Sequence, residues 1–138
     1  MSDAYRHLVF HAAVVLLFGL LLGAPYARAI KRGAPALVVN AWRVAHASLP
    51  LGATLMLATA AVLGALQVPE AVRWMIVLPM VVSAYAFCVA TPLAALTGDR
   101  GLQSSQGWGQ VVYASNMLGA AGSVLSAAVF LGAAAVSL

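Results

Sequence analysis

Four long apolar segments, separated by three more polar connections, are the feature that most constrains the fold of this chain. The segments cover residues 7–24, 40–66, 71–95 and 110–137. A helix needs about 20 apolar residues to cross a bilayer, and each segment is close to that length or longer. Only 7% of the residues are charged, whereas a soluble domain has about 25%. We therefore expect an all-α membrane protein that forms a single four-transmembrane-helix bundle over residues 1–138.

The first segment also has features of a signal peptide. Arg6 precedes the apolar run, and an Ala-Arg-Ala sequence at 27–29 follows it like a cleavage site. The run is longer than a usual signal core and contains His11, so we expect the segment to be retained. Gly19 and Gly23 form a Gly-x-x-x-Gly pair, which allows two helices to approach closely.

The basic residues lie in the connections and at the helix ends. Residues 25–35, which include Gly33 and two prolines that stop helices, are predicted to form the first connection. One side of the membrane would hold Arg28, Lys31, Arg32, Arg43 and Arg100, and the other side Arg6 and Arg73. The positive-inside rule then predicts that the first and third connections are cytoplasmic and that both termini lie outside. This rule explains the net charge of +4, so no nucleic-acid partner is expected.

The second apolar segment opens with an ionisable side chain at membrane depth. The sequence Asn40-Ala-Trp-Arg-Val-Ala-His46 places Trp42 and Arg43 near the interface and His46 about one helical turn further in. Such a group is costly in a membrane and indicates function by default. Imidazole is also the commonest metal ligand, including that of haem iron. The alternative is a histidine that only makes an inter-helix hydrogen bond or lies at the interface.

Other side chains have plainer interpretations. His7 and His11 share a helix face at a spacing that suits a metal pair, but no third ligand is evident, so two histidines that lie near the interface are the favoured explanation. Cys88 lies in an apolar segment, so packing is favoured over thiol chemistry. Tyr85 and Thr91 are the other deep polar groups of the third segment.

The fourth segment carries small residues at a regular spacing. Ser115, Gly119, Ser123 and Ala127 repeat every four residues, which predicts a stripe for tight helix packing. Asn116 lies next to this stripe. Because a buried amide needs hydrogen-bond partners, we expect Asn116 to face a neighbouring helix or a site.

The composition excludes most soluble-enzyme chemistry. Only three acidic residues occur, all near predicted membrane ends, and we find no Gly-rich phosphate loop, Ser/His/Asp set or Cys cluster. No acidic residue of the kind expected in a proton pump lies within an apolar segment. What remains is His46, with Arg43 three residues earlier. A haem would match this pair, because an imidazole can bind its iron and an arginine at the interface can bind its propionates.

Short motifs at three places match one family in the same order. His7 and Leu16-Leu-Phe-Gly19 match its first helix, Trp42-x-x-Ala45-His46 the start of its second, and Arg100-Gly-Leu102 the loop before its fourth. The spacing between the last two motifs is also the same. On these residues the chain resembles bacterial styrene oxide isomerase, a family of small four-helix membrane proteins.

The resemblance implies a homotrimer in the bacterial inner membrane with haem b between subunits. His46 would be the axial iron ligand, and Trp42 and Arg43 would contact the cofactor. Ferric iron would act as a Lewis acid on the oxygen of an aryl epoxide. The C–O bond would open towards a benzylic-type cation, a hydride would shift to the neighbouring carbon, and an aldehyde would leave without net redox change.

Two positions depart from the family pattern. Gly52 stands where the family has an asparagine, and Thr91 stands where it has a tyrosine that orients substrate. Tyr85 and Asn116 could supply similar groups, so we take Tyr85, Asn116 and Thr91 as the candidate catalytic residues. The departures leave open a non-catalytic membrane protein that senses, carries or stores haem. A structural subunit in which His46 only packs is a third hypothesis.

Overall fold

The computed structural model describes residues 3–103 and 106–138, and this part of the chain is helical with no strand. The helices are α1 (Asp3–Leu21), α2 (Gly23–Lys31), α3 (Ala36–Leu63), α4 (Glu70–Thr97) and α5 (Trp108–Ala135). Because α1 and α2 follow each other as one apolar unit, the described residues contain four helical segments long and apolar enough to cross a membrane. The predicted all-α, four-helix membrane fold is confirmed, and the chain is a multi-pass membrane protein.

The first connection is shorter than the sequence predicted, because α2 occupies most of residues 25–35. Pro25 lies in the first turn of α2, where a missing N–H interrupts the ladder of backbone hydrogen bonds without ending the helix. Gly33 ends it instead, at a φ of 62° that favours glycine. Only residues 32–35 therefore connect α2 to α3.

The long helices extend beyond the apolar core of a bilayer. Helices α3, α4 and α5 have 28 residues each, or about 42 Å at 1.5 Å per residue, whereas the hydrocarbon core is about 30 Å thick. The helices begin up to four residues before the predicted segments, at Ala36, Glu70 and Trp108. The helices are therefore long enough for their ends to reach the headgroup region.

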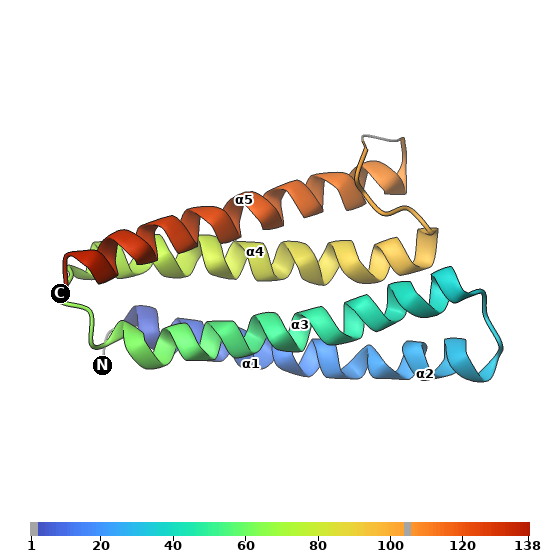
Figure 1. Ribbon diagram of the computed structural model, residues 1–138, viewed down its shortest axis with the longest axis horizontal. Helices are drawn as coiled ribbons and strands as arrows, with labels where there is room; N and C mark the ends of the chain where they lie inside the picture. The colour runs from blue at the N-terminus through green and yellow to red at the C-terminus, as the bar shows by residue number, and fades with distance from the viewer. Residues whose placement is uncertain (1–2, 104–105) are drawn as a thin grey trace.

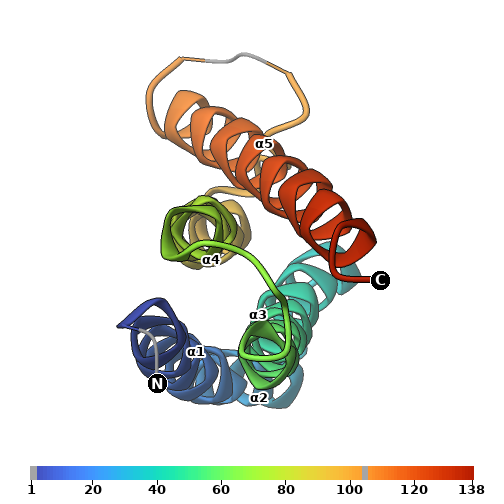
Figure 2. The same ribbon diagram turned by 90° about the vertical axis from the view of Figure 1, so that its left-hand side faces the viewer.

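The helices pack as two antiparallel pairs, which Figure 1 shows from the side. One pair is α1–α2 with α3, and the other is α4 with α5. Helix α4 joins the pairs through contacts with α1 and α3, whereas α5 contacts only α4 among the described elements. Figure 2 shows this arrangement from the end of the bundle. Both termini lie at one end (Figure 1), as predicted, and the α2–α3 and α4–α5 connections lie at the other.

Glycine allows the close approach of α1 to α3. A Cβ added at Gly19 would lie 2.6 Å from Cδ of Pro50 and 2.8 Å from Cβ of Leu49, so no larger residue fits without a shift. A Cβ at Gly23 would meet the ring of His46. The predicted role of the Gly-x-x-x-Gly pair in helix contact is confirmed.

The contact between α4 and α5 uses a different register from the one predicted. The buried residues of α5 that recur every seven positions are Val112, Gly119, Ser126 and Ala133. Ser123 and Ala127, which continue the predicted four-residue repeat, are exposed. Because α-helices turn by 100° per residue, a four-residue step rotates by about 40° away from a straight contact, whereas a seven-residue step nearly keeps it.

Candidate functional site

His46 projects from α3 towards the α1–α2 segment. Its Nδ1 atom lies 3.0 Å from the carbonyl oxygen of Gly19. A carbonyl oxygen can only accept a hydrogen bond, so Nδ1 must carry a proton and donate it. In the neutral imidazole, Nε2 then keeps a free lone pair.

Two residues of the α1–α2 segment fix the position of this ring. A Cβ at Gly23 would lie 3.0 Å from Cε1 of His46 and 3.5 Å from Nε2, so the ring lies directly against bare backbone. The ring of Tyr26 stacks on the imidazole, with centroids 6.1 Å apart and planes at 28°. Within the described residues, Nε2 has no hydrogen-bond partner and is not buried. The imidazole is therefore held in one orientation with one nitrogen available.

Trp42 and Arg43 lie near His46 in sequence but have different surroundings. Trp42, one turn before His46, packs against the hydrophobic core and lines a pocket of about 250 Å³ between α2 and α3. Arg43 is exposed, and its Nη2 donates a hydrogen bond to Oδ1 of Asn40. Neither residue is hydrogen-bonded to His46 in the part of the chain that the structure describes.

A second pocket, of about 240 Å³, contains two of the predicted catalytic residues. It lies between α3, α4 and the start of α5, and is lined by Leu37, Asn40, Ala41, Val44, Ala90, Thr91, Ala94, Arg100 and Asn116. Most of these side chains are apolar, and the polar ones come from all three helices and the α4–α5 connection. We call this the α3–α5 pocket. The prediction that Asn116 faces a neighbouring helix or a site is confirmed.

The hydrogen bonds of the α3–α5 pocket decide which groups remain free. Thr91 donates its hydroxyl proton to the carbonyl of Phe87, at 2.9 Å, so its oxygen can only accept a further bond. Asn116 donates through Nδ2 to the carbonyl of Arg100, at 3.3 Å, which leaves its second N–H and its oxygen unused. Of the two residues, only Asn116 has a donor left for a ligand.

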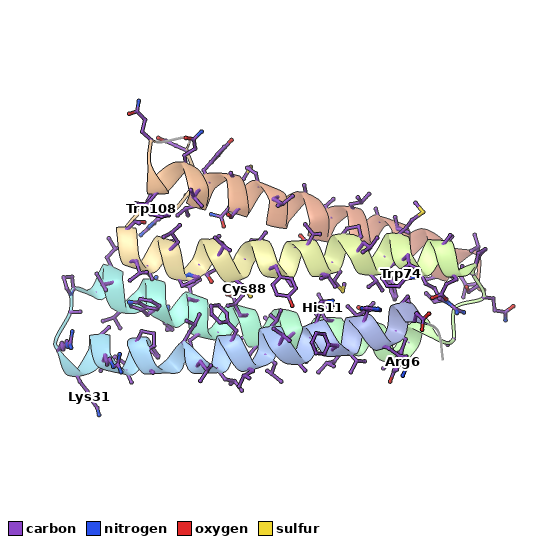
Figure 3. All side chains as sticks on the ribbon, turned by 180° about the vertical axis from the view of Figure 1, so that it is seen from behind. Arg6, His11, Lys31, Trp74, Cys88 and Trp108 are labelled. Carbon is purple, nitrogen blue, oxygen red and sulfur yellow. The ribbon has the colours of Figure 1, made fainter. Side chains whose placement is uncertain are left out.

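Tyr85 lies elsewhere, at the contact between α1 and α4. Its hydroxyl oxygen is 2.9 Å from Nδ1 of His11, and the rings of His11 and His7 stack with centroids 6.1 Å apart. Trp74 packs against His7. Figure 3 shows His11 on the side of α1 that faces α4. The two histidines thus belong to an aromatic cluster rather than standing alone, and Tyr85 does not line the α3–α5 pocket.

Comparison with known proteins identifies the family. The family model described as styrene oxide isomerase matches residues 4–135, which is nearly the whole chain. The chain belongs to the styrene oxide isomerase family. Neither the search of curated proteins nor that of solved structures gave a match. Membership of this family indicates a function related to epoxide isomerisation.

The haem expected from the sequence would need an axial ligand, and the chemistry around His46 fits that role. A metal-binding imidazole usually donates its other ring N–H to a carbonyl or carboxylate, which fixes the tautomer, and the Gly19 carbonyl has this role here. Within the described residues, no group of three or more His, Cys, Asp or Glu side chains could hold a bare metal ion.

The predicted site residues do not meet within one chain of this isomerase family member. His46 lies on the side of α3 that faces α1 and α2, whereas Thr91 and Asn116 line a pocket on the side that faces α4 and α5. Gly52 is exposed, and no atom lies within 4 Å of a Cβ built there. Both pockets are smaller than the roughly 300–1,000 Å³ of drug-sized ligand sites, so neither could enclose a haem.

Sequence reasoning missed Gly23 and Tyr26 as parts of the site. Both lie on the face of α1–α2 that meets α3, four and seven residues after Gly19. That spacing marks one face of a helix and is the signal that could have found them. The continuous helix through Pro25 was needed to apply it, and the sequence had placed a connection there.

Proposed function

We propose that this protein is a haem b-dependent isomerase that converts an aryl epoxide into an aldehyde. Family membership supports the reaction class. The observation that carries the proposal is the ring of His46, with Nδ1–H bound to the Gly19 carbonyl and Nε2 free. A fixed neutral imidazole with one free nitrogen is what an axial iron ligand requires.

His46 would hold the iron, and Arg43 and Trp42 would contact the edge of the cofactor. Arg43 is exposed near the start of α3 and uses Nη2 on Asn40, so its other N–H groups are free for a propionate. Trp42 lies one turn before His46. The bound iron would supply a Lewis acid for the epoxide oxygen, as metal ions do for other polarised oxygens.

The α3–α5 pocket would bind and orient the substrate. Leu37, Val44 and Ala90 offer apolar walls for an aromatic ring, and the pocket has room for a small aryl epoxide. The free N–H of Asn116 would direct the epoxide oxygen, while Thr91 could only accept a bond, because its proton is held by Phe87. Tyr85, which is bound to His11, would act on substrate only if that bond were exchanged.

A homotrimer would bring these groups together. In one chain, His46 and the α3–α5 pocket lie on different sides of α3. A second copy could place its pocket against the first copy's His46 and cover the haem. This separation supports the proposed trimer, in the bacterial inner membrane that the resemblance implies.

A non-catalytic haem-binding membrane protein is the second candidate. Two observations favour it: Gly52 provides no polar side chain where the family has an asparagine, and the hydroxyl proton of Thr91 is already committed. A sensor or carrier of haem would need His46 but none of the polar groups of the α3–α5 pocket.

Turnover of aryl epoxides distinguishes the two candidates. Detergent-purified, haem-loaded protein is incubated with a panel of aryl epoxides, and aldehyde is measured by gas chromatography, with His46→Ala as the control. We expect aldehyde from the wild type and none from the variant above the uncatalysed rate. If haem-loaded wild type leaves the whole panel unchanged, the isomerase proposal fails and the haem-binding protein remains.

A further inference from the structure

The polar side chains that line the pocket between α2 and α3 can all donate hydrogen bonds, and none can accept one. It has a volume of about 250 Å³ and is lined by Pro25, Arg28, Ala29, Arg32, Ala34, Val38 and Trp42. Its three polar side chains are two guanidinium groups and an indole N–H. Such a lining favours a ligand that carries only acceptors.

The donors of this pocket are free. Within residues 3–103 and 106–138, the side chains of Arg28, Arg32 and Trp42 have no hydrogen bond or ion pair, and the single ion pair, Arg73–Glu70, involves neither arginine. Two of the nearby backbone carbonyls, those of Arg28 and Ala29, each accept a bond of 3.0 Å from N–H groups just after α2. The side chains of the pocket therefore offer hydrogen-bond donors and no acceptor.

The local charge is strongly positive. Helices α2 and α3 with their connection carry four basic residues, Arg28, Lys31, Arg32 and Arg43, and no acidic residue. Helix α3 begins beside the pocket, and no side chain caps its N-terminus at Pro35. The free N–H groups of an uncapped helix start add positive potential, which attracts anions. The arginine side chains of the pocket and the uncapped start of α3 are thus two independent features that favour an oxyanion as the ligand.

The position of the pocket indicates which kind of molecule carries the oxyanion. It lies at the α2–α3 end of the bundle, where helices of this length can extend beyond the hydrocarbon core to the lipid headgroups, and Pro25, Ala29 and Val38 give it apolar walls. We propose that this pocket binds the phosphate group of an anionic membrane phospholipid, held by Arg28 and Arg32. Basic pockets between helices on the cytoplasmic side of membranes bind lipid headgroups in this way.

Native mass spectrometry of the detergent-purified protein, titrated with phosphatidylglycerol, tests the proposal. Arg28→Gln and Arg32→Gln should each weaken the apparent Kd about fivefold. Lys31→Gln is the matched control: it removes one charge from the same turn, but Lys31 does not line the pocket, so the Kd should change less than twofold. Ala34→Trp fills the pocket without a charge change and should abolish the tight binding.

Two further ligands distinguish the source. Phosphatidylcholine should bind at least tenfold more weakly than phosphatidylglycerol, and inorganic phosphate should not displace the lipid at millimolar concentration. The proposal is overturned if Lys31→Gln weakens binding as much as the arginine variants, because the effect would then be general surface charge. It is also overturned if phosphatidylcholine binds equally, or if phosphate alone competes.

Discussion

At the scale of single residues, three contacts of different kinds hold His46: a hydrogen bond from Nδ1 to the Gly19 carbonyl, the bare backbone at Gly23, and the stacked ring of Tyr26. The first selects the tautomer, and the other two restrict rotation of the ring. Each ligand bond formed by a pre-positioned ring avoids the entropy of ordering it. The contacts of His46 are therefore as important to the proposed haem site as the residue itself.

Gly23→Ala tests this arrangement. The new methyl group would lie 3.0 Å from Cε1 of His46, so the ring or helix must move. We expect at least tenfold weaker haem binding, measured by Soret titration of apoprotein. Gly132→Ala is the control, because no atom lies within 4 Å of a Cβ there. It should leave haem binding unchanged and keep or slightly raise the melting temperature, since alanine favours helix. Equal haem affinity in both variants would contradict the described position of the ring.

Asn116→Leu and Thr91→Val separate the two candidate catalytic residues that line the α3–α5 pocket. Of these two, only Asn116 has a donor left for an epoxide oxygen, because Thr91 donates to Phe87. Loss of one such donor typically costs about 10²–10³-fold in kcat, so Asn116→Leu should lower aldehyde formation by at least tenfold, whereas Thr91→Val should change it less than threefold. Both variants should keep a full Soret band. A larger loss for Thr91→Val would reverse the assignment.

The sequence was sufficient to make His46 a candidate, because it contains one imidazole in an apolar segment outside the first helix. It was not sufficient to identify Gly23 and Tyr26 as residues that hold the His46 ring, because that role depends on which face of α1–α2 meets α3. Tyr85 shows the same limit in the opposite direction. It was a candidate because it could replace the tyrosine that the family has at the position of Thr91, but its hydroxyl lies against His11 at the contact between α1 and α4.

At the scale of helices, the pair α4–α5 depends on close backbone approach. A Cβ at Gly122 would lie 2.7 Å from the carbonyl oxygen of Pro79, and one at Gly119 would lie 2.8 Å from the ring of Phe87. Ser83 also donates to the Gly119 carbonyl at 2.6 Å. Small residues allow this approach in membranes, where inter-helix packing replaces the hydrophobic effect.

Gly122→Val should therefore destabilise the protein. The side chain would collide with backbone of α4, and overpacking of this kind costs about 1–3 kcal/mol. Ala121→Val introduces the same side chain one residue earlier, at an exposed position, and should cost little. The check is the melting temperature of both variants in the same detergent. Equal melting temperatures would mean that α5 does not pack on α4 through Gly122.

Helix number and approximate limits followed from the length of the apolar segments, since a membrane helix must satisfy all of its own backbone groups. The register of contacts did not follow. The four-residue repeat on α5 was visible in the sequence, but α4 meets the seven-residue series that includes Gly119 and Ser126. In a membrane, lipid-facing and protein-facing residues are both apolar, so composition does not separate them.

At the scale of the whole molecule, α5 contacts only α4 among the helices that the structure describes, and His46 and the α3–α5 pocket lie on different sides of α3. A catalytic site that uses both requires more than one copy of the chain. The proposed homotrimer supplies them, and its closed symmetry repeats the same contact three times.

Mixing two inactive variants tests this arrangement. His46→Ala lacks the ligand, and Asn116→Leu lacks the pocket donor, so each alone should be inactive or nearly so. Co-expressed in equal amounts, they should recover about a quarter of the wild-type activity. Each site needs an intact His46 from one copy and an intact Asn116 from its neighbour, and random assembly supplies each of these groups about half of the time. The two purified variants, mixed without co-assembly, serve as the control. No recovery of activity in the co-expressed protein would mean that both groups of a site come from one copy.

The most direct measurement is the visible absorption spectrum of detergent-purified protein, wild type against His46→Ala, with His7→Ala as a matched histidine control. Since Nε2 of His46 is the free, fixed imidazole nitrogen, we predict a Soret band in the wild type and in His7→Ala that is lost in His46→Ala. A full Soret band in His46→Ala would contradict the ligand assignment. A wild type that stays colourless after haem reconstitution would contradict the haem-dependent function as a whole.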